Sequence, residues 1–133
     1  MTDVTVESAV TTSLFRRLMA RQMTGGDPAT PLAYIVFGNG AVYDDGQIRS
    51  PHPDNEQIYN QLLEKPIVVA SVVEENPYWL ECTGVLESTD MAGEQLNEVG
   101  ILDADRNLIC HKTFPSRTKD PEERYLFKIY FKF

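Results

Sequence analysis

The last ten residues of the chain, RYLFKIYFKF, constrain its fold more than any other stretch. Their apolar side chains recur at every second position, which is the period of an extended strand with one apolar face. We place these five residues in the core: Tyr125, Phe127, Ile129, Phe131 and Phe133. The opposite face is amphipathic, because two lysines alternate there with Leu126 and Tyr130.

Four further segments after residue 66 have the composition of strands. Each is rich in β-branched or aromatic residues and is bounded by Asn-Pro, Gly, Asp or Pro. They are IVVASVVEE (67–75), YWLECTGVL (78–86), LNEVGILDA (96–104) and NLICHKTF (107–114). Together with the terminal strand they predict an antiparallel sheet.

The N-terminal third has a helical pattern. Val10, Leu14 and Leu18 recur at four-residue steps, which predicts an amphipathic helix over about residues 6–23. The following MTGGDP should end it, since Gly25 can adopt a left-handed cap and the proline cannot continue a helix.

A second, shorter helix is expected over about residues 54–65. Asp54 can cap its first turn, Ile58 and Leu62 would face the core, and Pro66 would terminate it.

Between the two helices we expect a strand at about 32–37 and a long loop, 38–53. Asn39-Gly40 is also a good two-residue hairpin signal, so a small hairpin across 34–44 is the alternative. The loop could serve a small binding module as its ligand or peptide site.

These elements predict an α+β fold in which an N-terminal amphipathic helix and a second short helix pack on a mainly antiparallel β-sheet. The 133 residues are enough for one core. We therefore expect a single domain, 1–133, with a helical and loop part at about 6–65 and a sheet part at about 66–133.

Charge and hydropathy exclude several classes of protein. The net charge of −8 disfavours nucleic-acid binding, because such a surface repels phosphate. No apolar run approaches the roughly 18 residues that a membrane span needs, and the acidic N-terminus does not resemble a secretory signal. We expect the chain to be made in the cytosol.

Neither the cysteines nor the histidines form a reactive motif. Cys82 and Cys110 are too few for a disulfide framework and predict small buried residues in strands. His111 follows Cys110 in a strand, so their side chains should point to opposite faces. His52 lies between two prolines and should be exposed.

The acidic segment GILDADRNLIC has two interpretations. Asp103, Asp105 and Asn107 match the first three ligand positions of a calcium-binding EF-hand loop. However, Leu108 stands where that loop needs glycine and Phe114 where it needs glutamate. We favour a hairpin turn, in which Asp and Asn bond to their own backbone.

Two other candidates are weak. Gly38-x-Gly40 follows a strand but lacks the third glycine and the helix of a phosphate-binding loop. Asp44 and Asp45 are adjacent, which is typical of a solvated turn. We therefore expect no catalytic, cofactor-binding or metal-binding residue, and no enzyme.

The motifs of the sequence occur in an order and at spacings that resemble those of a known family. LNEVGILDADRNLICHKTFP, followed by a spacer and the alternating terminal strand, resembles the N-terminal domain of phage tail-collar fibre proteins. The likeness extends over about residues 10–133 and includes the opening helix, the FGNG that ends a strand, and NEQIYNQLLEKPI, where the family has a short helix with a tyrosine.

The resemblance implies a virion or prophage component without catalysis, which joins a tail fibre to the baseplate or collar as a symmetric homo-oligomer, possibly a trimer. We expect the interface to include the outer face of the terminal strand or the first helix. Family members continue into a fibre shaft, whereas this sequence stops at Phe133. That difference allows a truncated or prophage-derived form, a separate adaptor or an excised domain.

Overall fold

A computed structural model describes residues 1–76 and 78–132, and in it almost all regular structure is β-strand. The elements, in chain order, are β1 (Thr2–Thr11), α1 (Ser13–Met23), β2 (Leu32–Gly38), β3 (Gln61–Pro66), β4 (Val69–Val72), β5 (Trp79–Leu86), β6 (Gln95–Asp103), β7 (Leu108–Thr118) and β8 (Tyr125–Lys132).

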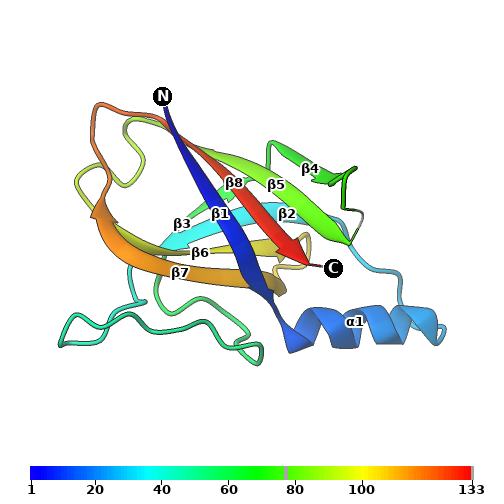
Figure 1. Cartoon of the computed structure of the whole chain (residues 1–133). Helices are drawn as coiled ribbons and strands as arrows, with labels where there is room; N and C mark the ends of the chain where they lie inside the picture. Colours follow the sequence, from blue (N-terminus) through cyan, green and yellow to red (C-terminus); the bar gives the residue numbers. More distant parts are fainter. Residues whose placement is uncertain (77, 133) are drawn as a thin grey trace.

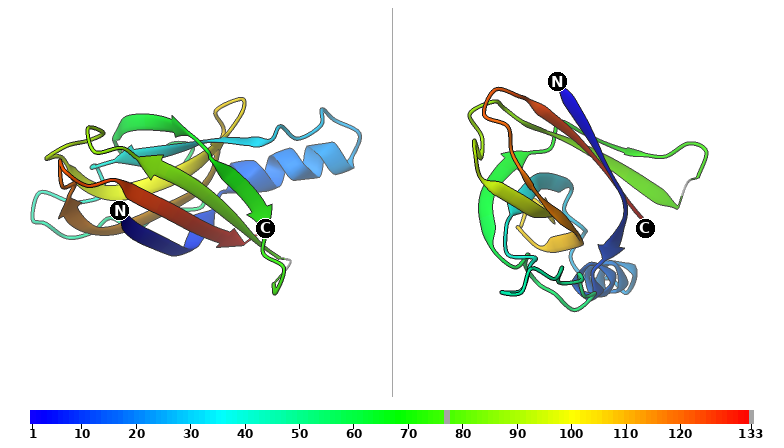
Figure 2. Two further views of the ribbon diagram at one scale, coloured as in Figure 1. Left: turned by 90° about the horizontal axis from the view of Figure 1, so that it is seen from above. Right: turned by 60° about the vertical axis from the view of Figure 1, so that its left-hand side comes forward.

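The eight strands form one curled sheet in the order β3-β2-β6-β7-β1-β8-β5-β4 (Figure 1). The chain passes directly from β3, at one edge, to β4, at the other, and β3 also contacts β5. Figure 2 shows the resulting curl around an enclosed interior. All strand pairs are antiparallel except β1 with β8, which run parallel.

The core fills the inside of this curl. Phe37 of β2 and Phe127 of β8 meet edge to face there, with ring centroids 4.9 Å apart. Both side chains are fully buried, and residues from β1, β5, β6 and β7 surround them. Segments that are far apart in sequence therefore share one core. Phe15 of α1 packs against it, and the loop after β2 contributes the buried residues Ala41 and Ile58.

The α+β prediction was wrong. Strands hold 50% of the residues and helix only 8%, with one short helix in the described part of the chain. Residues 6–11, predicted as helix, belong to β1. Val4 and Val6 lie on the inner side of β1, where it pairs with β8. The register shifts between Val6 and Ala9, where Ser8 has φ 56°. After this shift, Val10 and Thr11 pair with β7.

The first helix ends as predicted but begins later. Thr12 is extended (φ −80°, ψ 153°), and its hydroxyl accepts the N–H of Phe15, so α1 starts only at Ser13. After Met23 the chain turns with Gly25 in the left-handed region (φ 91°).

The second helix, expected over about 54–65, does not exist. Residues 54–60 form turns and bends, and 61–66 is strand β3, antiparallel to β2. Ile58 is buried as predicted, but Leu62 is 42% exposed because a strand sends it to the outer face. The backbone N–H groups of Tyr59 and Asn60 bond to the side chain of Glu98 in β6, and residues 61–66 pair with β2, so no helical hydrogen bonds form.

The other strand predictions are confirmed, except that the segment predicted at 67–75 is strand only over Val69–Val72 and ends in a turn at 74–75. In β8 the four described alternating residues, 125, 127, 129 and 131, are buried, while Phe133 lies outside the described residues. Strand 32–37 and the long loop are present, and the hairpin alternative across 34–44 is not. No helix in the described chain is long and apolar enough to cross a membrane.

Candidate functional site

The most unusual feature of the structure is the loop from 39 to 60, which joins β2 to β3 without a helix or strand of its own. Its first part is a small turn in which Val42 pairs with Ile48 in a single bridge. Its second part runs back along the body and is tied to the start of α1, because the Ser13 hydroxyl donates to Asp54 at 2.8 Å. Long loops without regular structure in compact domains are commonly functional or disordered, and this one is anchored.

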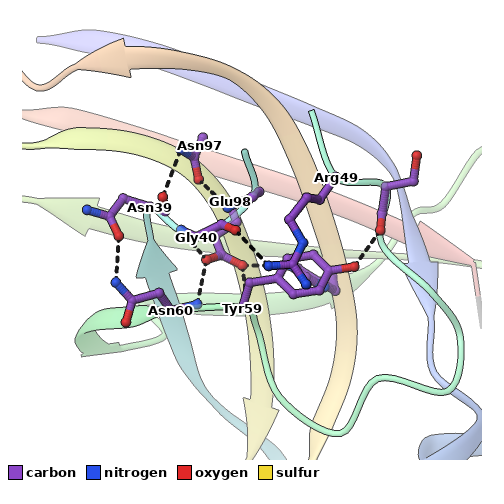
Figure 3. A network of polar contacts seen from close by, with 10 residues as sticks. Asn39, Gly40, Arg49, Tyr59, Asn60, Asn97 and Glu98 are labelled. Carbon is purple, nitrogen blue, oxygen red and sulfur yellow. Dashed lines mark hydrogen bonds and ion pairs between the residues drawn. The ribbon is translucent and has the colours of Figure 1, made fainter. Parts of the chain in front are cut away.

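The anchor is the carboxylate of Glu98 in β6, which is completely buried. One of its oxygens accepts the N–H of Tyr59 at 2.7 Å. The other accepts the N–H of Gly40 and the N–H of Asn60, both at 2.8 Å. A single side chain thus binds both ends of the loop to the sheet (Figure 3).

Asn97, the neighbour of Glu98, completes the anchor. Its Oδ1 accepts the N–H of Ala41 at 2.9 Å, and its Nδ2 donates to the carbonyl of Asn39 and to the hydroxyl of Ser116. Consecutive strand residues normally face opposite ways. Here the β6–β7 pairing shifts register between Leu96 and Glu98, and such a bulge redirects side chains.

His111 of β7 supports the carboxylate from inside. Its Nε2 lies 3.1 Å from Oε1 of Glu98. An ionised carboxylate only accepts hydrogen bonds, so Nε2 carries the proton and donates. The Nδ1 of His111 is buried and has no hydrogen-bond partner among the described atoms.

The hydrogen bonds decide the charge of Glu98. Burial by itself raises the pKa of this carboxyl, but the bonds from His111 and from the N–H groups of Asn60, Tyr59 and Gly40 outweigh it, so the pKa is lowered. The carboxylate is therefore ionised at neutral pH. Its bonds to Gly40, Tyr59 and Asn60 hold both ends of the loop on β6.

The glycines of FGNG are required by this close approach. A Cβ on Gly40 would lie 2.7 Å from the Cβ and the nitrogen of Asn60, and one on Gly38 would collide with the Asn60 carbonyl oxygen. Any larger residue would push the two ends of the loop apart. The glycines that resembled part of a phosphate loop thus let one backbone pass another.

The anchored loop carries a stack of aromatic and arginine side chains, in which Tyr43 is exposed and Arg49 and Tyr59 are half-buried. The guanidinium of Arg49 lies 3.8 Å from the ring centroid of Tyr59 and 5.5 Å from that of Tyr43. The Tyr59 hydroxyl donates to the carbonyl of Ser50 at 2.6 Å, which fixes the ring. The side chain of Tyr43 is 55% exposed, and that of Ile48, the residue before Arg49, is 43% exposed. Tyrosine and arginine in such a setting are typical of protein-binding surfaces.

The second arm of the loop, residues 54–59, lines an open hollow of about 580 Å³. Asn55 is one of the residues that line it, and its Nδ2 is buried without a hydrogen-bond partner among the described atoms. The hollow and the stack share Tyr59, so they form one continuous surface of the loop.

The turn at 103–107 is a hairpin, as favoured from the sequence. Asp103 is buried, and its carboxylate accepts the N–H groups of Asp105 and Asn107 at 3.0 and 2.9 Å and the Asn107 amide at 3.1 Å. Arg106 takes the left-handed conformation that such a turn needs (φ 63°). Among residues 1–76 and 78–132 no three His, Cys, Asp or Glu side chains gather as a metal site would require.

The remaining candidate residues form no site with one another, although both cysteines belong to the same core cluster. Cys82 and Cys110 are buried and free, as predicted; burial and the charge of Glu81 raise the pKa of Cys82 to about 12. His52 is exposed, and residues 44 and 45 form an exposed turn.

Sequence reasoning missed the anchor. His111 was predicted only to point away from Cys110, and Glu98 was not among the candidate residues. A signal was present, because the polar pair Asn97-Glu98 interrupts an otherwise apolar strand. A charged residue in a buried strand needs partners, which could have been sought in the long loop.

Comparison with known families identifies a relationship over most of the chain. Residues 6–127 match the model of the family described as phage tail-collar fibre protein, N-terminal. No curated protein matches the chain.

Proposed function

Because the chain belongs to the family of phage tail-collar fibre proteins, N-terminal, we propose that it is a non-enzymatic attachment domain, which links a tail fibre to the baseplate or collar. Membership supports a structural role in the phage tail and a place in the virion tail. The link to the baseplate, synthesis in the host cytoplasm and a possible prophage origin are parts of the proposal.

We further propose that the anchored loop is the surface that binds the neighbouring tail protein. The observation that carries this proposal is the buried carboxylate of Glu98, which fixes both ends of the loop by three backbone bonds. A preorganised loop loses little conformational entropy on binding, and this lowers the free-energy cost of docking. The loop considered from the sequence as a ligand site, 38–53, thus becomes a protein-binding surface.

The chemistry of the surface agrees with a protein partner. It offers a flat aromatic and arginine stack, which suits a protein surface better than it suits a small molecule. The high negative charge of the chain argues against nucleic acid as the partner. We also propose that the domain works as a homo-oligomer, with three-fold symmetry as the form suggested by the fibre resemblance.

The test is a pair of arginine variants in phage particles that carry this protein. Arg49→Ala removes the guanidinium of a half-buried loop residue, which lies over Tyr59 and donates to the carbonyl of Gly40 at 3.5 Å. It should reduce incorporation of the protein into tails, and a melting curve should show that the variant is still folded. Arg106→Ala is the matched control, because Arg106 also lies over a tyrosine, Tyr34, at 4.7 Å, but outside the loop. Equal incorporation of both variants would contradict the proposed loop surface.

A further inference from the structure

A groove of about 410 Å³ lies on the outer face of the sheet where β1, β5 and β8 meet. Tyr130 stands between the buried residues Ile129 and Phe131 and therefore points outward into it. Trp79 is the second aromatic side chain of the groove. The remaining lining residues are Thr5, Glu7, Ser8, Val73 and Asn76.

Negative charge gathers around this aromatic groove. Glu7 lines the groove, and Glu81 is the cross-strand partner of Tyr130. Burial, then the charge and the hydrogen bond of Glu81, and then the charges of Glu7 and Glu75 raise the pKa of the Tyr130 hydroxyl. None of the ion pairs among the described residues includes any of these three glutamates. Lys128 and Lys132 lie on the same outer face, two positions to either side of Tyr130 and opposite Thr5 and Trp79. The groove thus combines apolar area with three carboxylates and two flanking lysines.

Helix α1 has the opposite character. It lies outside the curled sheet (Figure 1) and has no buried residue. It contains three arginines and no acidic residue, although the chain as a whole carries −8. Arg17 makes a loose, exposed pair with Glu56 at 3.8 Å, whereas Arg16 and Arg21 belong to no ion pair of the described part.

The two faces of α1 are used differently. Phe15, Leu18 and Met19 line a cavity of about 170 Å³ against the body of the protein. The arginines are exposed, and so is Met23, at 84%. The solvent side of the helix is therefore basic with one large apolar side chain. Glu56 lies beside Arg17, and Arg21 also borders the cavity, which Asp27, Asp103 and Asp105 line as well.

We infer that the basic face of α1 in one copy of the chain docks in the aromatic, acidic groove of a second copy. Arginines over Trp79 and Tyr130 would gain cation–π attraction as well as pairing with the glutamates. The inference rests on the proposed homo-oligomer and assigns its contact. The two surfaces differ, so repeating the contact head to tail joins several copies into a ring. If two copies each place their helix in the other's groove, the contact forms a dimer.

Sedimentation of the full chain over micromolar concentrations tests the contact. The parent should associate at low salt and dissociate at about 0.5 M salt, where exposed charges are screened. Arg16→Glu with Arg21→Glu, or Glu7→Arg with Glu75→Arg, should each weaken self-association by about tenfold or more, because like charges then face each other. An equimolar mixture of the two double variants should recover association, since each supplies the surface that the other lacks.

The control is Glu94→Arg with Glu122→Arg, which makes the same change of charge at exposed positions away from the groove. It should associate at least as well as the parent, and circular dichroism should show that all variants are folded. A parent that remains at 15.0 kDa throughout overturns both the contact and the homo-oligomer. A parent that associates but is unaffected by both double variants, or a mixture that fails to recover, overturns this contact alone.

Discussion

Glu98→Gln is the sharpest perturbation of the loop anchor because it keeps the size of the side chain and removes its charge. The carboxylate accepts three backbone N–H groups and one imidazole N–H, whereas an amide has one accepting oxygen. If the amide nitrogen takes the place of Oε1, the N–H of Tyr59 and the Nε2–H of His111 lose their acceptor. If it takes the place of Oε2, those of Gly40 and Asn60 do.

The magnitude follows from the burial of the site. A buried group left without a partner costs about 1–3 kcal/mol, and bonds to a charged acceptor are worth about 1 kcal/mol more than neutral ones. We expect Glu98→Gln to lower the free energy of unfolding by about 2–5 kcal/mol, a large share of the total stability of a domain of this size.

Two assays are needed, because the loop can detach before the sheet unfolds. Urea denaturation reports the global free energy, and limited proteolysis reports release of residues 39–60. Glu64→Gln is the matched control: Glu64 pairs with the exposed Arg106, and such surface pairs contribute about 0–1 kcal/mol. If Glu98→Gln were as stable as Glu64→Gln and its loop were cleaved no faster, the anchor would not hold the loop.

Four other results are expected. The lowered pKa of Glu98 means that, as pH falls, the unfolded chain takes up the proton before the folded protein does. The stabilisation should therefore be complete above about pH 5 and should fall as pH drops below the ordinary glutamate value of about 4.3. Urea denaturation at a series of acidic pH values would check this, and the free energy of unfolding should depend less steeply on pH in Glu98→Gln. Phe127→Ala should cost about 3–5 kcal/mol and Lys128→Ala little; the reverse order in urea melts would mean that the facing of β8 is inverted. Millimolar calcium should leave the melting temperature unchanged, since the carboxylate of Asp103 already binds its own turn, and a rise of many degrees would refute the hairpin-only interpretation. Burial that raises the pKa of Cys82 to about 12 should keep this thiol unreactive at pH 8 until the protein unfolds, and rapid labelling of the native protein would disprove it.

The strands were predictable where apolar and polar residues alternate in the sequence and the apolar ones are the residues that the fold buries. In β8 the apolar face of the sequence is the buried face of the structure, and the Asp103 turn has the residues that its hairpin requires. The same rules failed at β1, because Val10, Leu14 and Leu18 have helical spacing although they lie on both sides of a strand-to-helix boundary. Ser8 in a left-handed conformation and the cap at Thr12 set that boundary, and neither has a strong local signal.

The second helix failed for a different reason. Its sequence has helical spacing at Ile58 and Leu62, but Glu98, almost forty residues later, binds the backbone N–H groups of Tyr59 and Asn60. Tertiary hydrogen bonds therefore overrode local preference. The anchor could not be derived from the loop itself, since its bonds are to backbone groups that every residue has.

The most direct test of the proposed attachment is a photocrosslink formed inside assembled tails. A photoreactive phenylalanine derivative in place of Tyr43 lies on the exposed stack of the loop, and the same group in place of Glu94 lies at an exposed site away from it. We predict that irradiation of particles joins position 43, but not position 94, to a second tail protein. Efficient incorporation with no adduct at 43, or with equal adducts at both positions, would contradict the account.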